Sequence, residues 1–374
     1  MDIGLQKTAV FLCFIFLGIL LKRKFASKEE LSGIKKIILN LALPATIFIA
    51  LLSVEVKGLM IWLPLLAIGL NVVLFLVIPP LLPFFGLSRD TSAYRTARLM
   101  LPSLAPGLSC FPFIHEFLGD DALAKAAMAD LGNKVFVLIV LYIVAMNWHY
   151  RIQAKSRKSN NNQWLKMLGV MGSEPVNLLI IAALVLLIMG VNMSALPFVL
   201  SETLQKLSLI MTPLVLLFIG LAVKLKREQF FKLFSLLCLR AGIVFVVVGA
   251  LKLMLGIGDA ITLVLLLSFG LSACSFWPYA HIALVEGLEK DSNHQTFDSG
   301  FAVNILALSF PFSTLVILSV LNSGNLFVHS EKIFITAGVL FFFASVPALL
   351  KRSRKRISFK ITKSSIDTTG TEHV

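Results

Sequence analysis

The chain has 374 residues, of which 57% are hydrophobic and only 14% are charged, and its mean hydropathy is +0.89. Soluble domains are about 45–50% apolar and about 25% charged, so this composition excludes an ordinary soluble protein and also a disordered one. The formal net charge of +14 fits either a nucleic-acid partner or basic loops on the cytoplasmic side of a membrane protein.

Apolar stretches follow one another along the chain, and each is about as long as the roughly 20 residues that a helix needs to cross a bilayer. Eleven such stretches are predicted, at about 5–21, 37–54, 59–80, 99–118, 129–149, 176–193, 207–223, 233–254, 261–285, 298–321 and 333–350. The first is not a typical signal peptide, because the basic cluster at 22–24 follows it instead of preceding it. An all-α, multi-pass protein of a bacterial inner membrane or another plasma membrane is therefore predicted.

The basic residues are concentrated in alternate loops. If the N-terminus lies outside, the inner segments and the tail hold 26 Lys and Arg, and the outer segments hold 5. Such a bias favours an external N-terminus and a cytoplasmic C-terminus. It leaves no basic stripe with interleaved aromatic residues, so no nucleic-acid partner is expected.

Two short patterns predict helix starts between these spans. Ser27 and Glu30 have the spacing of a capping box, and Ser173-Glu174-Pro175 precedes the sixth span. Residues 151–175 are predicted to be a polar cytoplasmic linker, and residues 351–374 a basic, disordered cytoplasmic tail.

The two halves of the chain resemble each other at a separation of 166 to 169 residues. The matched pairs are Pro44 with Pro213, Pro112 with Pro278, His115 with His281, and Asp130 with Asp298. Residues 1–150 and 176–321 would each contain five spans, and an odd number inserts the second copy with opposite polarity. Inverted repeats are typical of secondary transporters, and the span at 333–350 would be an addition to them.

Proline near the middle of the fourth and ninth spans predicts a broken helix in each half. Small residues precede both prolines: Ser109 and Cys110 before Pro112, and Ser275 before Pro278. Unwound backbone is tolerated at membrane depth where it is buried in protein or lines a cavity, and the following half-helices would offer N–H groups to an anion. The alternative is a simple proline kink. Asn40, one turn before Pro44, is a further candidate for this substrate site.

Ionisable and amide side chains within spans are the candidates for ion coupling, because burying them is costly. They are His115, Asp130, Asn133, His281 and Asp298. The alternatives are packing roles for the histidines, and helix caps for Asp130 at the fifth span and Asp298 at the tenth. Arg240 either extends to the cytoplasmic surface or is a counter-ion within the membrane, and the four cysteines are predicted to be buried thiols.

The chain resembles the auxin efflux carrier family in several segments. These are LKRKFASKEELSGIKKIILNLALPATIF (21–48), PFIHEFLG (112–119), SLIMTPLVLLFIGLAVK (208–224) and the stretch from WPYAHIALVEGLEKD to FAVNILALSFP (277–311). The resemblance implies ten spans in inverted five-span repeats, with crossed broken helices at spans 4 and 9 and a small organic anion near Pro112 and Pro278. The sodium–bile acid symporter family shares this architecture.

A secondary transporter of a small organic anion, working by alternating access and coupled to protons, is therefore the predicted function. The alternatives are a sodium-coupled symporter on the same fold, and a sensor or intramembrane enzyme with a transporter-like core. There is no enzyme motif, metal spacing or cofactor motif, so neither catalysis nor a bound metal or cofactor is expected; a homodimer is left open.

Overall fold

The computed structural model describes residues 3–25, 27–52, 60, 62–152, 175–222, 230–289, 295–323 and 325–346. Most of the predicted linker at 151–175, the helix-start pattern at 173–174 and the whole predicted tail at 351–374 lie outside these residues. Within the described ranges the regular structure is helical, and there are no strands.

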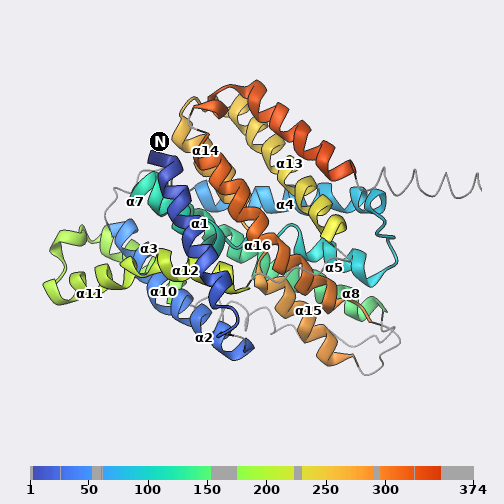
Figure 1. The fold of residues 1–374 in the computed structure, drawn as a ribbon, viewed down its shortest axis with the longest axis horizontal. Helices are drawn as coiled ribbons and strands as arrows, with labels where there is room; N and C mark the ends of the chain where they lie inside the picture. The colour runs from blue at the N-terminus through green and yellow to red at the C-terminus, as the bar shows by residue number, and fades with distance from the viewer. Residues whose placement is uncertain are drawn as a thin grey trace, which may run out of the picture.

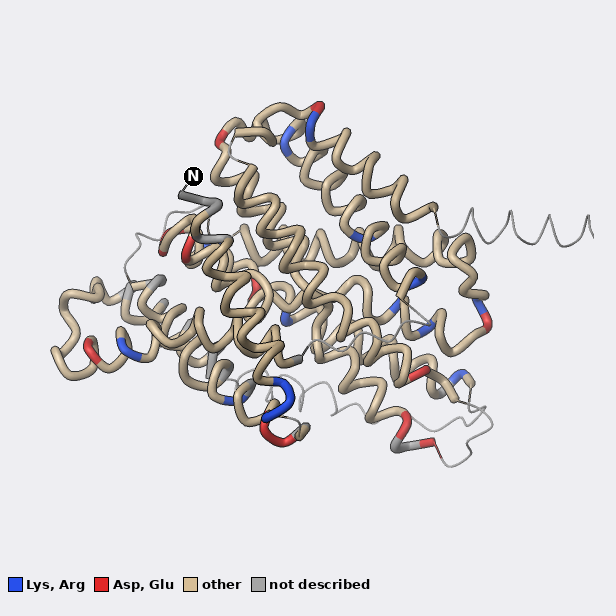
Figure 2. The backbone as a smooth tube through the Cα atoms, in the orientation of Figure 1, with Lys and Arg blue, Asp and Glu red and all other residues tan. Residues whose placement is uncertain are grey.

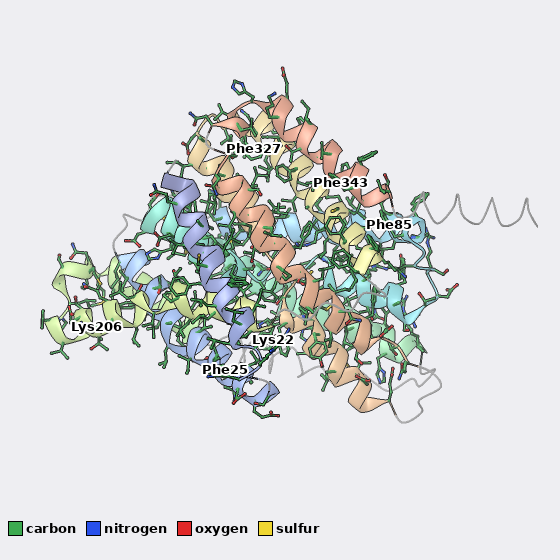
Figure 3. The ribbon with its side chains drawn as sticks, viewed as in Figure 1. Lys22, Phe25, Phe85, Lys206, Phe327 and Phe343 are labelled. Carbon is green, nitrogen blue, oxygen red and sulfur yellow. The ribbon has the colours of Figure 1, made fainter. Side chains whose placement is uncertain are left out.

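Five helices of the described ranges are long and apolar enough to cross a membrane. They are Leu63–Phe85, Phe111–His149, Phe198–Leu221, Phe230–Leu255 and Ser299–Leu321, and shorter apolar helices occur at Ala9–Leu21, Asn40–Ile49 and Ala260–Gly270. Large apolar side chains are also abundant on the surface, as the sticks around the ribbon show (Figure 3), with Phe198 79% and Phe84 75% exposed. The all-helical fold and these apolar helices are those of a membrane protein.

The helices pack in two groups, which we call bundle A and bundle B. Bundle A lies on the left in Figure 1 and contains α1 (Ile3–Leu21), α2 (Lys28–Ile37), the π-helix η1 (Ile38–Ala42), α3 (Leu43–Leu52), α10 (Pro175–Ile188), α11 (Phe198–Leu209) and α12 (Met211–Ala222). Within it, α1 runs along α12, and α3 packs on α10 and α11. The predicted capping box is confirmed at the start of α2, where the Ser27 N–H donates to Glu30 Oε2 and the Glu30 N–H donates to Ser27 Oγ, both at 3.1 Å.

Bundle B contains most of the remaining helical segments. They are α4 (Leu63–Leu81), α5 (Ser92–Met100), the short α6 (Pro106–Ser109), α7 (Phe111–Val135), the π-helix η4 (Phe136–Val140), α8 (Leu141–Ile152), α13 (Phe230–Leu255), α14 (Ala260–Gly270), α15 (Phe276–Leu288) and α16 (Ser299–Leu321). Helix α4 runs along α7, α13 and α16 pack on α14, and α15 packs on α8 and α16. The main contact between the bundles is that of α3 with α7.

A last helix over residues 330–346 lies beside α13 at the top of Figure 1. Two glycines of α13, seven residues apart, receive two phenylalanine rings of this helix. A Cβ built on Gly242 would lie 2.6 Å from the Phe341 ring, and one on Gly249 would lie 2.9 Å from the Phe334 ring. The helix therefore packs closely on bundle B, through a row of positions that lack a side chain.

Charged residues are found mostly near helix ends and in connections, and long stretches of the tube between them carry none (Figure 2). Lys206 of α11, for example, lies at the edge of the molecule and pairs with Glu202 one turn earlier (Figure 3). The charged side chains that do lie deep in bundle B are therefore exceptional. They are described next.

Candidate functional site

Two helical segments of bundle B are interrupted, and we call the gaps the first interruption (residues 101–105, between α5 and α6) and the second interruption (residues 271–275, between α14 and α15). The local sequence explains the first, because Pro102 and Pro106 lack N–H groups. Proline also disfavours helical geometry in the residue before it, and Ala105 has φ −125° and ψ 62°. At the second, the side chain of Ser275 accepts a hydrogen bond from the Trp277 N–H and thereby caps the start of α15.

The two interruptions are hydrogen-bonded to each other, although about 170 residues separate them. The Ala105 N–H donates to the Ala273 carbonyl at 2.8 Å. In return, the Ala273 N–H donates to Ser109 Oγ at 2.8 Å, and the Ser275 N–H donates to Ser103 Oγ at 2.9 Å. Backbone groups that have no helical partner at these gaps are thus satisfied by the opposite gap.

The two prolines predicted at the crossing point begin the half-helices that follow the interruptions. Pro112 is the second residue of α7, and Pro278 is the third residue of α15. Proline is tolerated in the first turn, because an N–H group there has no acceptor within the helix. The bonds that join the two segments lie upstream of these prolines. Of the substrate-site candidates, Ser275 is buried in the second interruption, and Ser109 and Cys110 are buried at the end of α6, just after the first. Asn40 is exposed in η1 and takes no part in these bonds.

Arg240 of α13 is 2% exposed and holds the first interruption. Its Nε donates to the Leu101 carbonyl at 2.8 Å, and its Nη2 donates to the Ser103 carbonyl at 3.1 Å. No Asp or Glu of the described ranges forms an ion pair with it. The alternative in which Arg240 extends to the surface is therefore wrong, and the guanidinium is a buried cation at the point where the interruptions meet.

The prediction that all four cysteines are buried is wrong for Cys13, which is exposed on α1. Cys110 and Cys274 are fully buried at the two interruptions, and the Cys274 N–H donates to Ser309 Oγ of α16 at 3.2 Å. The described residues contain no group of three or more His, Cys, Asp or Glu that could hold a metal ion.

A second buried polar cluster lies directly beside the first interruption. Asn133 of α7 donates from Nδ2 to the Leu104 carbonyl at 3.0 Å and to Asp130 Oδ1 at 2.8 Å, and Asn71 of α4 donates to Asn133 Oδ1 at 3.0 Å. Lys134 Nζ lies 3.8 Å from Asp130 Oδ2. Asp130 therefore lies in the interior of α7 and is 5% exposed, so its alternative role as a helix cap is wrong.

The remaining ion-coupling candidates lie elsewhere and are not brought together. His115 pairs with Asp120 at 3.1 Å, and both side chains are partly exposed. His281 is buried and its Nε2 donates to the Val137 carbonyl of η4 at 2.9 Å, which is the packing alternative. Asp298 caps α16, with its Oδ1 accepting from the Phe301 N–H at 2.8 Å, which confirms the capping alternative.

Ser103 and the carbonyls of Leu101 and Leu104 are parts of this site that the sequence did not indicate as candidates. The signal for them in the sequence is the spacing of Pro102 and Pro106, which marks a non-helical turn before the small residues that precede Pro112. No protein-family model matches the chain, and no curated protein matches it either.

Proposed function

We propose that this protein is a secondary transporter of a small organic anion, of the auxin efflux carrier type. The observation that carries the proposal is the meeting of two interrupted helices around a buried arginine. Discontinuous helices that meet inside a bundle are how many secondary carriers build a substrate site at the middle of the membrane. Non-helical backbone at that depth is tolerated where it is buried in protein, and the two gaps meet this condition because each satisfies backbone groups of the other.

An anion at this site would meet three sources of positive potential. The N-terminal end of α15 follows the second interruption directly, and that of α7 follows the first interruption after the short α6. A helix N-terminus carries free N–H groups and about half a unit of positive charge. Arg240 adds a full charge that no carboxylate of the described ranges balances. A carboxylate substrate would supply the missing negative charge, and guanidinium and carboxylate match geometrically.

The arrangement of elements along the chain supports two repeats. The interruptions start at residues 101 and 271, close to the offset of 166 to 169 residues found in the sequence. Pro44 and Pro213 likewise fall at matching places, the second residue of α3 and the third of α12, each just after a break in the regular α-helix. On this proposal the chain has its N-terminus outside, and bundle B moves against bundle A to expose the site to each side in turn.

The test is a thermal-shift screen of the purified protein against small mono- and dicarboxylates, because a ligand that binds only the folded state raises its melting temperature. A carboxylate that stabilises the wild type should lose its effect in Arg240→Gln and keep it in Lys252→Gln, which removes a basic residue near the other end of α13. Uptake of that carboxylate into proteoliposomes, with sodium replaced by choline, then separates proton from sodium coupling. If no carboxylate shifts the melting temperature and none is taken up, the proposal is wrong.

A further inference from the structure

The cluster beside the first interruption contains two amides whose orientations depend on each other. Asn133 Nδ2 faces two atoms that can only accept, the Leu104 carbonyl and Asp130 Oδ1. Its own oxygen must therefore face Asn71, and Asn71 must present its N–H group there. The network is thus ordered in one direction, from Asn71 to Asn133 to the carboxylate.

The outer end of the chain of amides is not fixed. Asn71 is fully buried, and its Oδ1 has no hydrogen-bond partner among the residues that the structure describes. An amide that is held on one side only can turn over without breaking a bond on the other. The direction of the network is therefore set at its inner end, by Asp130.

The carboxylate has few charged neighbours. The helices packed on α7, which are α3, α4, α6, α12, α14 and α16, and the adjoining η4 contain no ionisable side chain within their bounds, and Asp298 lies at the very start of α16. Cys110 and the guanidinium of Arg240 lie at the interruptions, and on α7 itself Lys134 is one turn away. The side chains of Asp130 and Lys134 are 7% and 12% exposed, so the two charges balance each other in a nearly closed site.

We propose that Asp130 is the proton-binding group of this carrier, and that a proton on it reverses the Asn133 and Asn71 amides and releases the Leu104 carbonyl. The role of this switch in transport rests on the proposed function. The switch itself is a property of the fold, and it can be observed without a substrate.

The step is a simple proton gain. A proton from water binds Asp130 Oδ1, and the resulting acid donates to an oxygen of Asn133, which requires the Asn133 amide to turn. Its N–H group then faces Asn71, which turns as well and accepts with Oδ1. The Asn133 oxygen now faces the Leu104 carbonyl, and because two acceptors repel each other, the first interruption loosens.

The same step couples the proton to an anion. Once Asp130 is neutral, its charge no longer balances Lys134, and the net positive charge of the buried site around the first interruption increases by one unit. The site then attracts an anion more strongly, and removal of the proton reverses this. Among the other candidates, His281 already donates to a carbonyl and Asp298 caps a helix, and neither touches the interruptions through the bonds described above.

The switch is tested by hydrogen–deuterium exchange of the full chain in detergent, at an acidic and at a neutral pH, with rates corrected for the intrinsic effect of pH. The reporters are the peptides that contain the Ala105 and Ser275 amides, which bond across the interruptions. We expect their exchange in the wild type to rise on the order of tenfold at acidic pH, the factor for about one lost hydrogen bond. Asp130→Asn cannot gain the proton and should exchange at the same rate at both pH values.

Two further variants separate the switch from a general effect on folding. Asp121→Asn removes an exposed carboxylate of α7 with the same one-turn lysine partner, Lys125, and should behave as the wild type does. Asn71→Leu keeps Asp130 but removes the amide that must accept, and should lose most of the pH response. Equal exchange at both pH values in the wild type, or a pH response that persists in Asp130→Asn, would overturn the proposal.

The outcome is independent of the test of transport. If exchange shows no switch while a carboxylate is bound and taken up, the proposed function stands and the proton site is wrong. If exchange behaves as expected while no carboxylate is bound or moved, the switch stands and the proposed function is wrong.

Discussion

Asp259 shows how a single side chain supports the site from a distance. It caps α14, the helix that leads into the second interruption, with Oδ1 accepting from the Ile261 N–H at 3.3 Å and Oδ2 from the Thr262 N–H at 2.8 Å. The Thr262 hydroxyl also donates to Oδ2, and this bond is the main cause of a lowered pKa of Asp259. The capping interaction is therefore made by the ionised carboxylate.

Replacing Asp259 by Ala should lower the free energy of unfolding by about 1 kcal/mol at neutral pH, the usual value of a lost N-cap. Because the folded-state pKa lies below the ordinary value of 3.8, the contribution is complete above about pH 5 and disappears as the pH falls through the folded-state pKa. Melting temperatures of wild type and variant, measured from neutral to strongly acidic pH, should therefore converge at low pH. A difference that stays constant down to that pH would show that the ionised cap is not the cause.

Among single residues, sequence reasoning was most successful where the interaction is local. The Ser27 and Glu30 capping box and the Asp298 cap depend on neighbours within three positions, and both are present. The sequence does not decide between the two alternatives for Arg240, because its partners at Leu101 and Ser103 are almost 140 residues away. Partners so distant in the chain are set by packing, which no local pattern encodes.

At the level of elements, α1 and α12 are held together by glycine. A Cβ on Gly220 would overlap the Ile15 carbonyl oxygen, and one on Gly18 would overlap the Leu217 carbonyl oxygen. The two backbones therefore touch, which is how helices associate in membranes, where apolar surface alone gives little driving force. The contact is central to bundle A, because α1 makes its main contact with α12.

Gly220→Ala should therefore destabilise the protein by about 1–3 kcal/mol, the usual cost of overpacking, although alanine favours a helix more than glycine does. Gly69 of α4 is the matched control, since a Cβ there meets no atom within 4 Å. Gly69→Ala should leave the melting temperature unchanged or raise it. Equal melting temperatures for Gly220→Ala and Gly69→Ala would show that the close contact of α1 with α12 does not contribute to stability.

The prolines of the fourth and ninth spans predicted a broken helix in each, which is confirmed, although the first gap begins earlier in the chain than the residues before Pro112 indicated. The predicted span at 99–118 covers the end of α5, the short α6 and the start of α7, and the span at 261–285 covers parts of α14 and α15. A hydropathy window averages over a gap as short as residues 101–105. The π-helices at 38–42 and 136–140 are also absent from the expectation. Single extra residues in a turn leave the apolar composition unchanged, so only the structure reveals them.

On the scale of the whole molecule, the prediction of paired halves rested on four weak matches at nearly one offset. Their structural roles differ: Pro112 and Pro278 both start half-helices, whereas Asp130 is buried in a helix interior and Asp298 is a cap. The proline pair thus keeps its backbone position, whereas the Asp130 and Asp298 pair keeps neither backbone geometry nor side-chain role. The two ends of the site are for this reason chemically unequal, with the Asp130–Lys134 pair beside the first interruption alone.

The division into two bundles makes a mechanical prediction at their boundary. Helix α3 of bundle A approaches α6 of bundle B, where a Cβ on Gly107 would lie 2.9 Å from Leu43 Cδ2. Cysteines at both positions, with Cys13 replaced by Ser, should form a disulfide on oxidation, because the side chain at 43 points at the Cβ position of residue 107. If bundle B must move against bundle A, oxidised Leu43→Cys/Gly107→Cys should lose carboxylate flux in proteoliposomes and regain it on reduction, while each single variant keeps it under both conditions. If flux continues while the two cysteines are joined, the site must open to both sides without any displacement of α6 from α3.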